Sequence, residues 1–154
     1  MELYLIRHAH AVDEEENPER PLSARGRKQV LTLAKFLAAS GALHATQFWH
    51  SSLVRSRETA ELLVRGLGLE APLHEMAGLE PCDEPAAIAR RLKGLTEPLA
   101  IVGHEPHLSG LASLLVGGGT DAPIFVVRKC AAIALEGSGA RWQVRWHLSP
   151  ELLA

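Results

Sequence analysis

The sequence predicts an α/β fold, a three-layer α/β/α sandwich with a mostly parallel central sheet. Short apolar runs of strand length alternate with longer segments in which apolar residues recur at helical spacing. Polar or charged residues directly follow the runs at residues 3–6, 46–50 and 98–102. This is typical of parallel strands, whose carboxyl ends form ligand sites. We expect helices on both faces of the sheet, joined to the strands by right-handed crossovers.

The composition is that of an ordinary globular protein. The chain has 154 residues, of which 47% are hydrophobic and 22% charged, and we expect residues 1–154 to form a single domain. The formal net charge of −2 provides no general basic field for nucleic acid or an anionic membrane, so any anion site must be local. The first apolar run is too short for a signal peptide, and no stretch approaches membrane-spanning length. A cytoplasmic protein is the expectation.

The first third of the chain contains two predicted strands and one helix. The strand at residues 3–6 is followed by an acidic, solvated loop at residues 11–20. Ser23 is a plausible N-cap for a helix whose apolar residues recur at helical spacing, and Gly41 is its natural stop. The second buried strand is expected at residues 46–50.

The middle of the chain continues the alternation. A helix is expected at about residues 53–66, and Ser51 and Ser52 can cap its start. A short strand at residues 69–76 and a loop at residues 81–85 follow. This interval has no room for a large lid insertion.

The last part of the chain holds a helix, the clearest buried strand and a terminal group of strands. Ile88, Leu92 and Leu95 mark the helix, and the strand at residues 98–102 follows it. An amphipathic helix over residues 108–115 then ends at three glycines. Further strands are expected at residues 124–127, 130–135 and 142–147, the last two pairing as a hairpin across residues 137–139.

Four cationic or titratable residues lie where a parallel sheet would bring them together. Arg7 and His8 follow the first strand, His104 follows the strand at residues 98–102, and Arg55 lies in the first turn of a helix. Arginine forks match phosphate oxygens, so a phosphoryl group is the natural ligand. One histidine could attack phosphorus while the other, held cationic, stabilises the charge on its oxygens.

Simpler interpretations of these residues remain open. The first strand could be a surface strand that happens to end in Arg7 and His8. Arg55 could form an ordinary ion pair on the helix surface with Glu58 or Glu61.

Two other functions also remain open. A metal-dependent hydrolase could use the His-x-His and His-x-x-His spacings of His8, His10, His104 and His107. However, no aspartate completes a metallohydrolase motif, and Arg7 would repel a dication. A non-catalytic phosphate-binding module is the second alternative. The two cysteines lack the spacing of a zinc site or a disulfide framework.

Four segments resemble, in order, the motifs of the histidine phosphatase superfamily, whose fold is phosphoglycerate mutase-like. The resemblance is strongest to its small branch, the SixA-type phosphohistidine phosphatases. This chain departs from the common motifs at Ala9 (usually glycine), Ser52 (usually proline) and Glu58 (usually glutamine). The matching segments are Arg7-His8-Ala9, Arg20-Pro21-Leu22-Ser23-Ala24-Arg25-Gly26, Ser51-Ser52-Leu53-Val54-Arg55-Ser56-Arg57-Glu58-Thr59-Ala60 and Val102-Gly103-His104-Glu105-Pro106.

The resemblance implies a phosphatase that forms a covalent intermediate. His8 would be the nucleophile and become transiently phosphorylated, while Arg7 and Arg55 clamp the phosphoryl oxygens. His104 would donate a hydrogen bond to the same group in the transition state. Water would then release phosphate, and neither a metal nor an organic cofactor is implied. Glu58 could pair with Arg55 in the empty site and compete with phosphate.

The acid that protonates the leaving group is less clearly marked. Glu80 lies near the position of this carboxylate in larger relatives, and Asp13 and Glu105 are rivals. An exposed loop glutamate is the simple alternative for Glu80. A protonated phosphohistidine is a good leaving group and could do without an acid, whereas an alkyl phosphate needs one more.

The absence of a long insertion before His104 indicates the kind of substrate to expect. Larger relatives cover the pocket with segments inserted before the second catalytic histidine, and this chain lacks them. We therefore expect an open cleft that takes a phosphorylated side chain on a protein, such as phosphohistidine on a histidine phosphotransfer domain. A small phosphoester is the alternative substrate.

Overall fold

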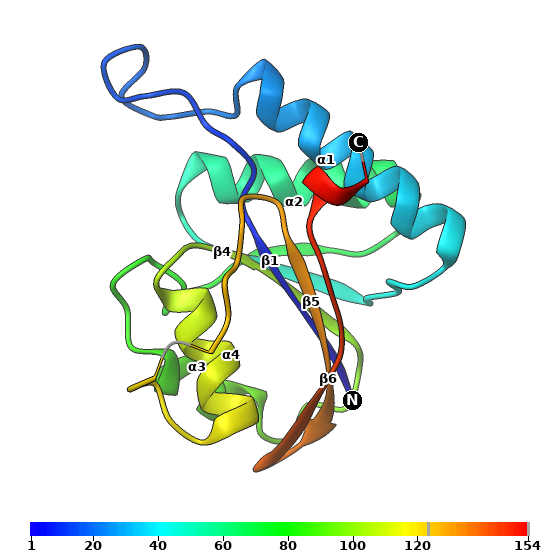
Figure 1. The fold of residues 1–154 in the computed structure, drawn as a ribbon, viewed down its shortest axis with the longest axis vertical. Coiled ribbons are helices and arrows are strands. Elements are labelled where there is room, and N and C mark those ends of the chain that lie inside the picture. Colours follow the sequence, from blue (N-terminus) through cyan, green and yellow to red (C-terminus); the bar gives the residue numbers. More distant parts are fainter. Residues whose placement is uncertain (123, 154) are drawn as a thin grey trace.

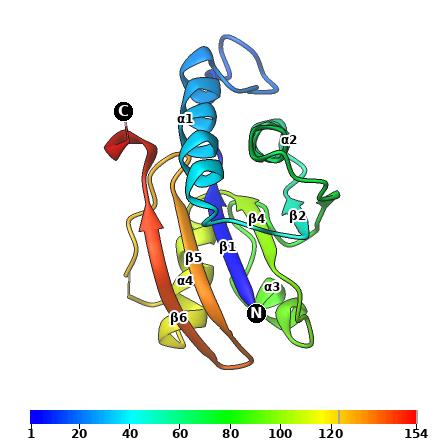
Figure 2. The same ribbon diagram turned by 90° about the vertical axis from the view of Figure 1, so that its right-hand side faces the viewer.

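The protein folds around one six-stranded sheet. The structure is a computed structural model that describes residues 1–122 and 124–153. The strand order is β3-β2-β4-β1-β5-β6, and Figure 2 shows β4, β1, β5 and β6 side by side in this order. The strands are β1 (Glu2–Arg7), β2 (Gln47–His50), β3 (Leu73–Glu75), β4 (Leu99–Gly103), β5 (Ala132–Ser138) and β6 (Arg141–Leu148).

Parallel pairing dominates, as the sequence predicted. The pairs β1–β4, β2–β4 and β2–β3 are parallel, whereas β1–β5 and β5–β6 are antiparallel. The antiparallel pair β5–β6 is the predicted terminal hairpin. The predicted fold class is confirmed.

Four helices cover the two faces of the sheet, with α1 and α2 on one side and α3 and α4 on the other (Figure 1). Alternate residues of β1 serve the two cores: Tyr4 and Ile6 pack toward α1 and α2, whereas Leu3 and Leu5 pack toward α3 and α4. The helices are α1 (Ala24–Ser40), α2 (Val54–Leu67), α3 (Pro85–Leu92) and α4 (His107–Gly117), and a short 3₁₀ helix, η1 (Pro150–Leu152), follows β6.

Helix α1 begins and ends where its sequence predicted. The Ser23 side chain accepts a hydrogen bond from the Gly26 N–H, and Gly41 closes the helix in the left-handed conformation. Gly26 also allows a close approach, because a Cβ there would lie 1.9 Å from the His10 carbonyl oxygen. The helix start is thereby seated against the chain that leaves β1.

Two of the predicted strands differ from the structure: one does not form, and the other is shorter than predicted. Residues 124–127 form no strand, and Ile124 and Val126 are exposed. The Val127 carbonyl instead accepts a hydrogen bond from the Arg7 guanidinium at 2.8 Å, so this apolar run borders the carboxyl end of β1. Strand β3 covers only the last part of the interval predicted for it, residues 69–76.

The predicted capping of α2 was also wrong. Its N-cap is Leu53, and no side chain caps its backbone N–H groups. Ser52 bonds to Glu80, and Ser51 contacts His104 and accepts from the N–H of Leu53 at 3.2 Å, so neither serine is the N-cap residue that the sequence suggested. None of the helices in the described residues is both long and apolar enough to cross a membrane.

Candidate active site

The carboxyl ends of β1, β4 and β2 meet at one edge of the sheet. In the β1–β4 register Arg7 lies opposite Gly103, and in the β2–β4 register His50 lies opposite Val102. The residues that follow these strands are therefore neighbours. The His8 N–H donates to the Gly103 carbonyl at 3.0 Å, which fixes the backbone at the exit of β1.

The His8 side chain is held in one tautomer. It is 6% exposed, and its Nδ1 lies 2.7 Å from the Ala9 carbonyl oxygen. A carbonyl can only accept a hydrogen bond, so the neutral ring carries its proton on Nδ1 and leaves the Nε2 lone pair free. Ala9 does not have a positive φ, so alanine fits at this usual glycine position without backbone strain.

His104 lies beside His8. The two ring centroids are 5.0 Å apart and the ring planes are tilted by 50°. His104 is 1% exposed, and its Nε2 lies 2.6 Å from Ser51 Oγ. Ser51 thus orients this ring, a role that the sequence analysis missed. Its position directly after β2, at the ligand-binding edge of the sheet, was the signal that could have identified it.

Both arginines reach the same region from different elements. Arg7 ends β1, and Arg55 lies in the first turn of α2. Both guanidinium groups act electrostatically on His8 and His104, lowering the pKa of each ring after the larger effect of burial. The structure therefore brings together Arg7, His8, Arg55 and His104, the set predicted from the sequence.

Several buried nitrogen atoms in this cluster have no hydrogen-bond partner within the described residues. They are Nε of Arg7, Nε of Arg55 and Nδ1 of His104. The two arginine nitrogens are charged donors, and leaving a buried donor without a partner costs roughly 1–3 kcal/mol, and more for a charged group. A bound anion with several oxygens would satisfy such donors, and phosphate has the matching geometry.

Glu58 does not pair with Arg55. The sequence-based suggestions that Glu58 forms a surface ion pair with Arg55, or competes with phosphate for it, were therefore wrong. One oxygen of Glu58 accepts from the Leu22 N–H at 2.8 Å, and the other lies 3.1 Å from Arg27. Glu61 pairs with Arg57 at 3.3 Å. Glu58 thus ties α2 to the segment before α1 and leaves Arg55 available to an anion.

Burial keeps both site histidines neutral when no anion is bound. Desolvation, reinforced by His104 and the arginines, lowers the pKa of His8 to about 3 despite the opposing bond to Ala9. Desolvation and then Arg55 lower the pKa of His104 to about 4. Neither histidine is cationic in the site without an anion, and a cationic histidine beside a bound phosphoryl group stays a prediction. A phosphoryl dianion would favour protonation of His104.

These pKa shifts predict that acid destabilises the protein before its carboxylates are protonated. Below the ordinary histidine pKa of 6.5, His8 and His104 become protonated in the unfolded chain but stay neutral in the folded protein. The free energy of unfolding should therefore fall between pH 6.5 and about 4, by up to about 1.4 kcal/mol per pH unit for each histidine. Urea unfolding at a series of pH values measures this slope.

Single substitutions test which groups cause the slope. His8→Asn should make it shallower, because the unfolded chain then gains one proton fewer. His74→Asn is the matched control, since His74 is exposed on β3. Equal slopes in the wild type, His8→Asn and His104→Asn would contradict this explanation.

The candidate acids differ in how they are held. Glu80 Oε1 accepts from both the N–H and the Oγ–H of Ser52, at 3.1 and 2.6 Å, and its charge acts on Arg55. Glu105 accepts from the Ser109 N–H at 2.8 Å at the start of α4. Asp13 is exposed and acts on His10 and Lys129. Glu80 is thus fixed next to the serine that contacts His104.

The histidines of the metal-site alternative do not form a cluster. His10 Nδ1 lies 2.6 Å from Ser23 Oγ, and His107 lies at the start of α4, where Asp83 is its charged neighbour. Among residues 1–122 and 124–153, no group of three histidine, cysteine or carboxylate side chains could hold a metal ion. The described residues thus offer no ligand set for that alternative.

Comparison with known proteins identifies the family. The sequence profile described as the histidine phosphatase superfamily (branch 1) matches residues 3–83. The chain belongs to this superfamily. Membership supports phosphatase activity, and therefore a phosphorylated substrate. The match covers the segments that supply Arg7, His8 and Arg55.

Individual relatives agree with this family. The chain is 24% identical to the phosphohistidine phosphatase SixA of Escherichia coli (strain K12), covering 97% of this chain and 94% of SixA. A structure of SixA complexed with tungstate superposes with a TM-score of 0.88 at 20% identity, over the full length of both chains. A putative α-ribazole-5′-P phosphatase from Escherichia coli has a TM-score of 0.79 at 20% identity, covering 97% of this chain and 98% of that one.

Proposed function

We propose that this protein is a phosphatase that hydrolyses protein phosphohistidine through a covalent phosphohistidine intermediate on His8. One observation carries the proposal: the Nδ1–H of His8 is committed to the Ala9 carbonyl, which leaves the Nε2 lone pair free, and the nearby Arg7 and Arg55 each have a buried Nε without a partner among the described residues. A neutral imidazole nitrogen is a competent nucleophile only when its lone pair is available. The arginines supply the charge that binds the phosphoryl group.

In the first step His8 Nε2 attacks phosphorus, and the bond from phosphorus to the leaving group breaks. The positive charge that develops on the His8 ring is stabilised by the Ala9 carbonyl, which accepts from Nδ1. Arg7, Arg55 and His104 neutralise the charge on the three equatorial oxygens. A protonated phosphohistidine departs as neutral imidazole and needs no further proton, whereas a departing alkoxide takes its proton from the carboxyl group of Glu80.

In the second step a water molecule attacks the phosphorus of phosphorylated His8. The phosphorus–nitrogen bond breaks, its electron pair returns to Nε2, and the proton lost by water passes to a nearby base. Inorganic phosphate leaves and His8 is again neutral. Burial favours this return, because it holds the pKa of His8 far below neutrality.

Several features favour a phosphoprotein as the substrate. The curated relative that matches over nearly the whole chain is a phosphohistidine phosphatase. Between α2 and β4 the described residues form only the short strand β3 and the helix α3, so this interval holds no long insertion. We propose a single histidine phosphatase domain that needs no cofactor and acts in signalling on a partner such as a histidine phosphotransfer domain. The cytoplasmic location stays a prediction.

A second candidate function uses the same residues on a small phosphomonoester. The structural likeness to the putative α-ribazole-5′-P phosphatase favours it. The same clamp and nucleophile would act, but an alkoxide would leave and would require a general acid. The two functions therefore differ in how much they depend on an acid.

A substrate panel tests the proposed function. It contains a phosphohistidine-bearing phosphotransfer domain, p-nitrophenyl phosphate and glycerol phosphate. We expect kcat/KM to be highest for the phosphohistidine protein and lowest for glycerol phosphate. A higher kcat/KM for glycerol phosphate than for the phosphohistidine protein would overturn the proposal in favour of the small-ester phosphatase.

Glu80→Gln should separate substrates by their leaving groups. We expect about a 10²-fold loss of kcat on glycerol phosphate and almost none on phosphohistidine, because an alkoxide needs protonation. Ser52→Ala should give a smaller loss on the same ester, since Ser52 holds the Glu80 carboxylate with two hydrogen bonds and the variant removes one.

The control for this prediction is Glu97→Gln, because Glu97 is exposed on the chain before β4. It should leave all three rates unchanged. Equal losses on glycerol phosphate and phosphohistidine in Glu80→Gln would show that Glu80 does not act as the leaving-group acid.

A further inference from the structure

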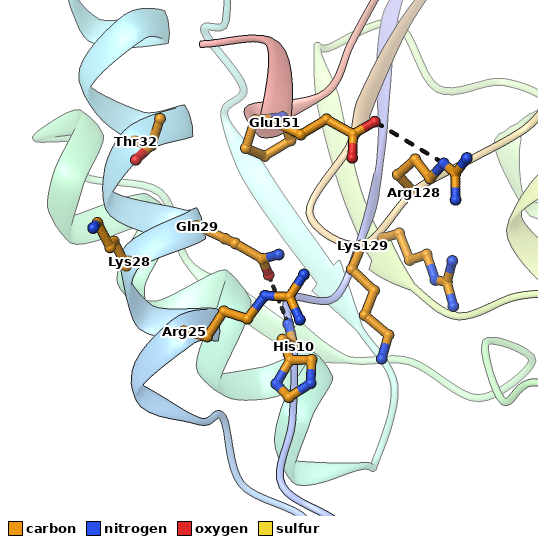
Figure 3. A pocket seen from close by; sticks show the side chains of 10 residues that line it. His10, Arg25, Lys28, Gln29, Thr32, Arg128, Lys129 and Glu151 are labelled. Atoms are coloured by element: carbon orange, nitrogen blue, oxygen red, sulfur yellow. Dashed lines mark hydrogen bonds and ion pairs between the residues drawn. The ribbon is translucent and has the colours of Figure 1, made fainter. Parts of the chain in front are cut away.

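A hollow with a basic lining adjoins the proposed catalytic cluster. This basic cavity has a volume of about 530 Å³ and includes Arg7, which is also half of the proposed phosphate clamp. Arg25 and Lys28 lie on its α1 side, and Arg128 and Lys129 lie on the opposite side, as Figure 3 shows. His8 and His104 are not among its lining residues. The cavity therefore extends away from the reacting phosphorus.

The charge of the basic cavity is poorly compensated. Five cationic side chains line it, and the single carboxylate in the lining is Glu151. Glu151 lies 4.0 Å from Arg128, and both side chains are more than 60% exposed (62% and 66%), so their pairing is weak. Outside the lining, Asp13 acts on Lys129 from the acidic loop. This concentration of cations contrasts with a chain whose net charge is −2.

The cations also act on one another. Burial, followed by the charges of Arg7 and Arg20, lowers the pKa of Lys129. Burial lowers the pKa of Arg7, the carboxylate of Glu105 partly opposes this, and the guanidinium of Arg128 adds a smaller lowering. Cations held this close are costly without a counter-anion, and an anion in the cavity would relieve their repulsion.

The α1 side of the basic cavity is bonded to the chain that follows β1. Gln29 Oε1 accepts a hydrogen bond from the His10 N–H at 2.9 Å, which ties α1 to the chain two residues beyond the proposed nucleophile (Figure 3). A group bound in the cavity is therefore held in a set position relative to His8. Such a subsite suits a substrate that carries a second anionic group beyond its phosphoryl group.

Exposed apolar side chains on the same segments favour a protein as the source of that anion. Leu31 on α1 is 66% exposed, Val126 before Arg128 is 73% exposed, and Leu152 in η1 is 78% exposed. Each belongs to a segment that also supplies charged residues to the cavity. Protein interfaces combine apolar contacts with arginine in this way, whereas a free phosphoester makes little use of exposed apolar side chains.

We propose that the basic cavity binds acidic side chains that flank the phosphorylated residue of the protein substrate. The inference rests on the proposed function, because it assigns a second contact to the same phosphoprotein. Arg7 joins the two subsites, with the phosphoryl group on one side and the carboxylates of the partner on the other. Charge complementarity then selects acidic partners and speeds their association.

The test uses two phosphohistidine peptides that differ only in having glutamate or glutamine beside the phosphohistidine. The enzyme variant is Arg25→Glu combined with Lys28→Glu, two cavity residues on α1 whose charges do not act on the proposed catalytic residues. We expect KM for the glutamate peptide to rise about 10-fold with kcat unchanged. KM for the glutamine peptide and the rate with p-nitrophenyl phosphate should stay the same, and the latter also reports correct folding.

The control variant is Arg90→Glu combined with Lys93→Glu, in α3 and just after its end. It reverses two charges away from the basic cavity.

Peptide binding is measured separately by calorimetry, with unphosphorylated versions of both peptides. The glutamate version should bind wild type more tightly than the glutamine version, and the double charge reversal should abolish the difference. Equal binding of the two versions would overturn the inference, whether or not phosphohistidine is hydrolysed. A second probe is propane-1,3-diyl bisphosphate, which carries two phosphate groups. If the double charge reversal weakened binding of this compound but not of the glutamate peptide, the cavity would bind a second phosphate, and the inference would be overturned. Failure of the proposed function shows up differently, as no hydrolysis of either phosphopeptide.

Discussion

Replacing His8 with asparagine is expected to lower kcat by about 10⁴-fold or more on every substrate, because no other group can accept the phosphoryl group. Asparagine is chosen because its amide can still donate to the Ala9 carbonyl, which now accepts from His8 Nδ1 at 2.7 Å. The buried site then keeps its backbone geometry while losing the attacking nitrogen. Steady-state kinetics with p-nitrophenyl phosphate measure the loss.

His10→Asn is the matched control for this variant. His10 lies two residues further along, and its ring bonds to Ser23. The variant should keep most of the wild-type rate. A His8→Asn enzyme with more than about a tenth of wild-type activity would contradict the nucleophilic role, since loss of a covalent nucleophile costs far more than that.

Replacing Arg55 with alanine is expected to lower kcat/KM by about 10³-fold, the scale on which preorganised transition-state donors act. Arg55 Nε is buried without a partner, and neither Glu58 nor Glu61 pairs with it. Its charge is therefore available to the phosphoryl group. Arg55→Lys should recover only part of the loss, because lysine supplies a point charge without the planar fork.

Arg57→Ala provides the comparison two residues away on the same helix. Arg57 is half exposed and pairs with Glu61 at 3.3 Å, a surface contact worth little. Its removal should leave kcat/KM nearly unchanged. If Arg57→Ala and Arg55→Ala caused equal losses, the effect would belong to α2 as a whole and not to the clamp.

The sequence predicted the centre of the sheet well because the runs at residues 3–6 and 98–102 are short, apolar and clearly bounded. Residues 98–102 are an example: β4 is buried throughout and lies between β1 and β2. That order places the ends of three strands together, which is why Arg7, His8, Arg55 and His104 could be grouped from their positions, whereas Glu80 rested on the family resemblance. The run at residues 124–127 was wrongly predicted to be a strand because it is also apolar. Its Val127 carbonyl accepts a hydrogen bond from Arg7 and does not pair with a neighbouring strand.

Contacts between side chains were less predictable than positions. Nothing in the local pattern distinguishes a serine that caps a helix from one that orients a histidine, so Ser51 was misassigned. Glu58 has the spacing of a helix-surface partner for Arg55, but a backbone N–H and Arg27 from another segment bind it instead. The basic cavity escaped notice for the same reason, since its cations come from segments about 100 residues apart, such as those of Arg25 and Lys129.

The most direct test of the central claim is to trap the phosphorylated enzyme. Wild-type protein is mixed with a radioactive phosphohistidine substrate, quenched within the first turnovers, and mapped by mass spectrometry. We predict an acid-labile, alkali-stable label on His8 that is absent from His8→Asn and still present, though formed more slowly, in His104→Asn. A label on any other residue, or an undiminished label in His8→Asn, would contradict the assignment of His8 as the nucleophile.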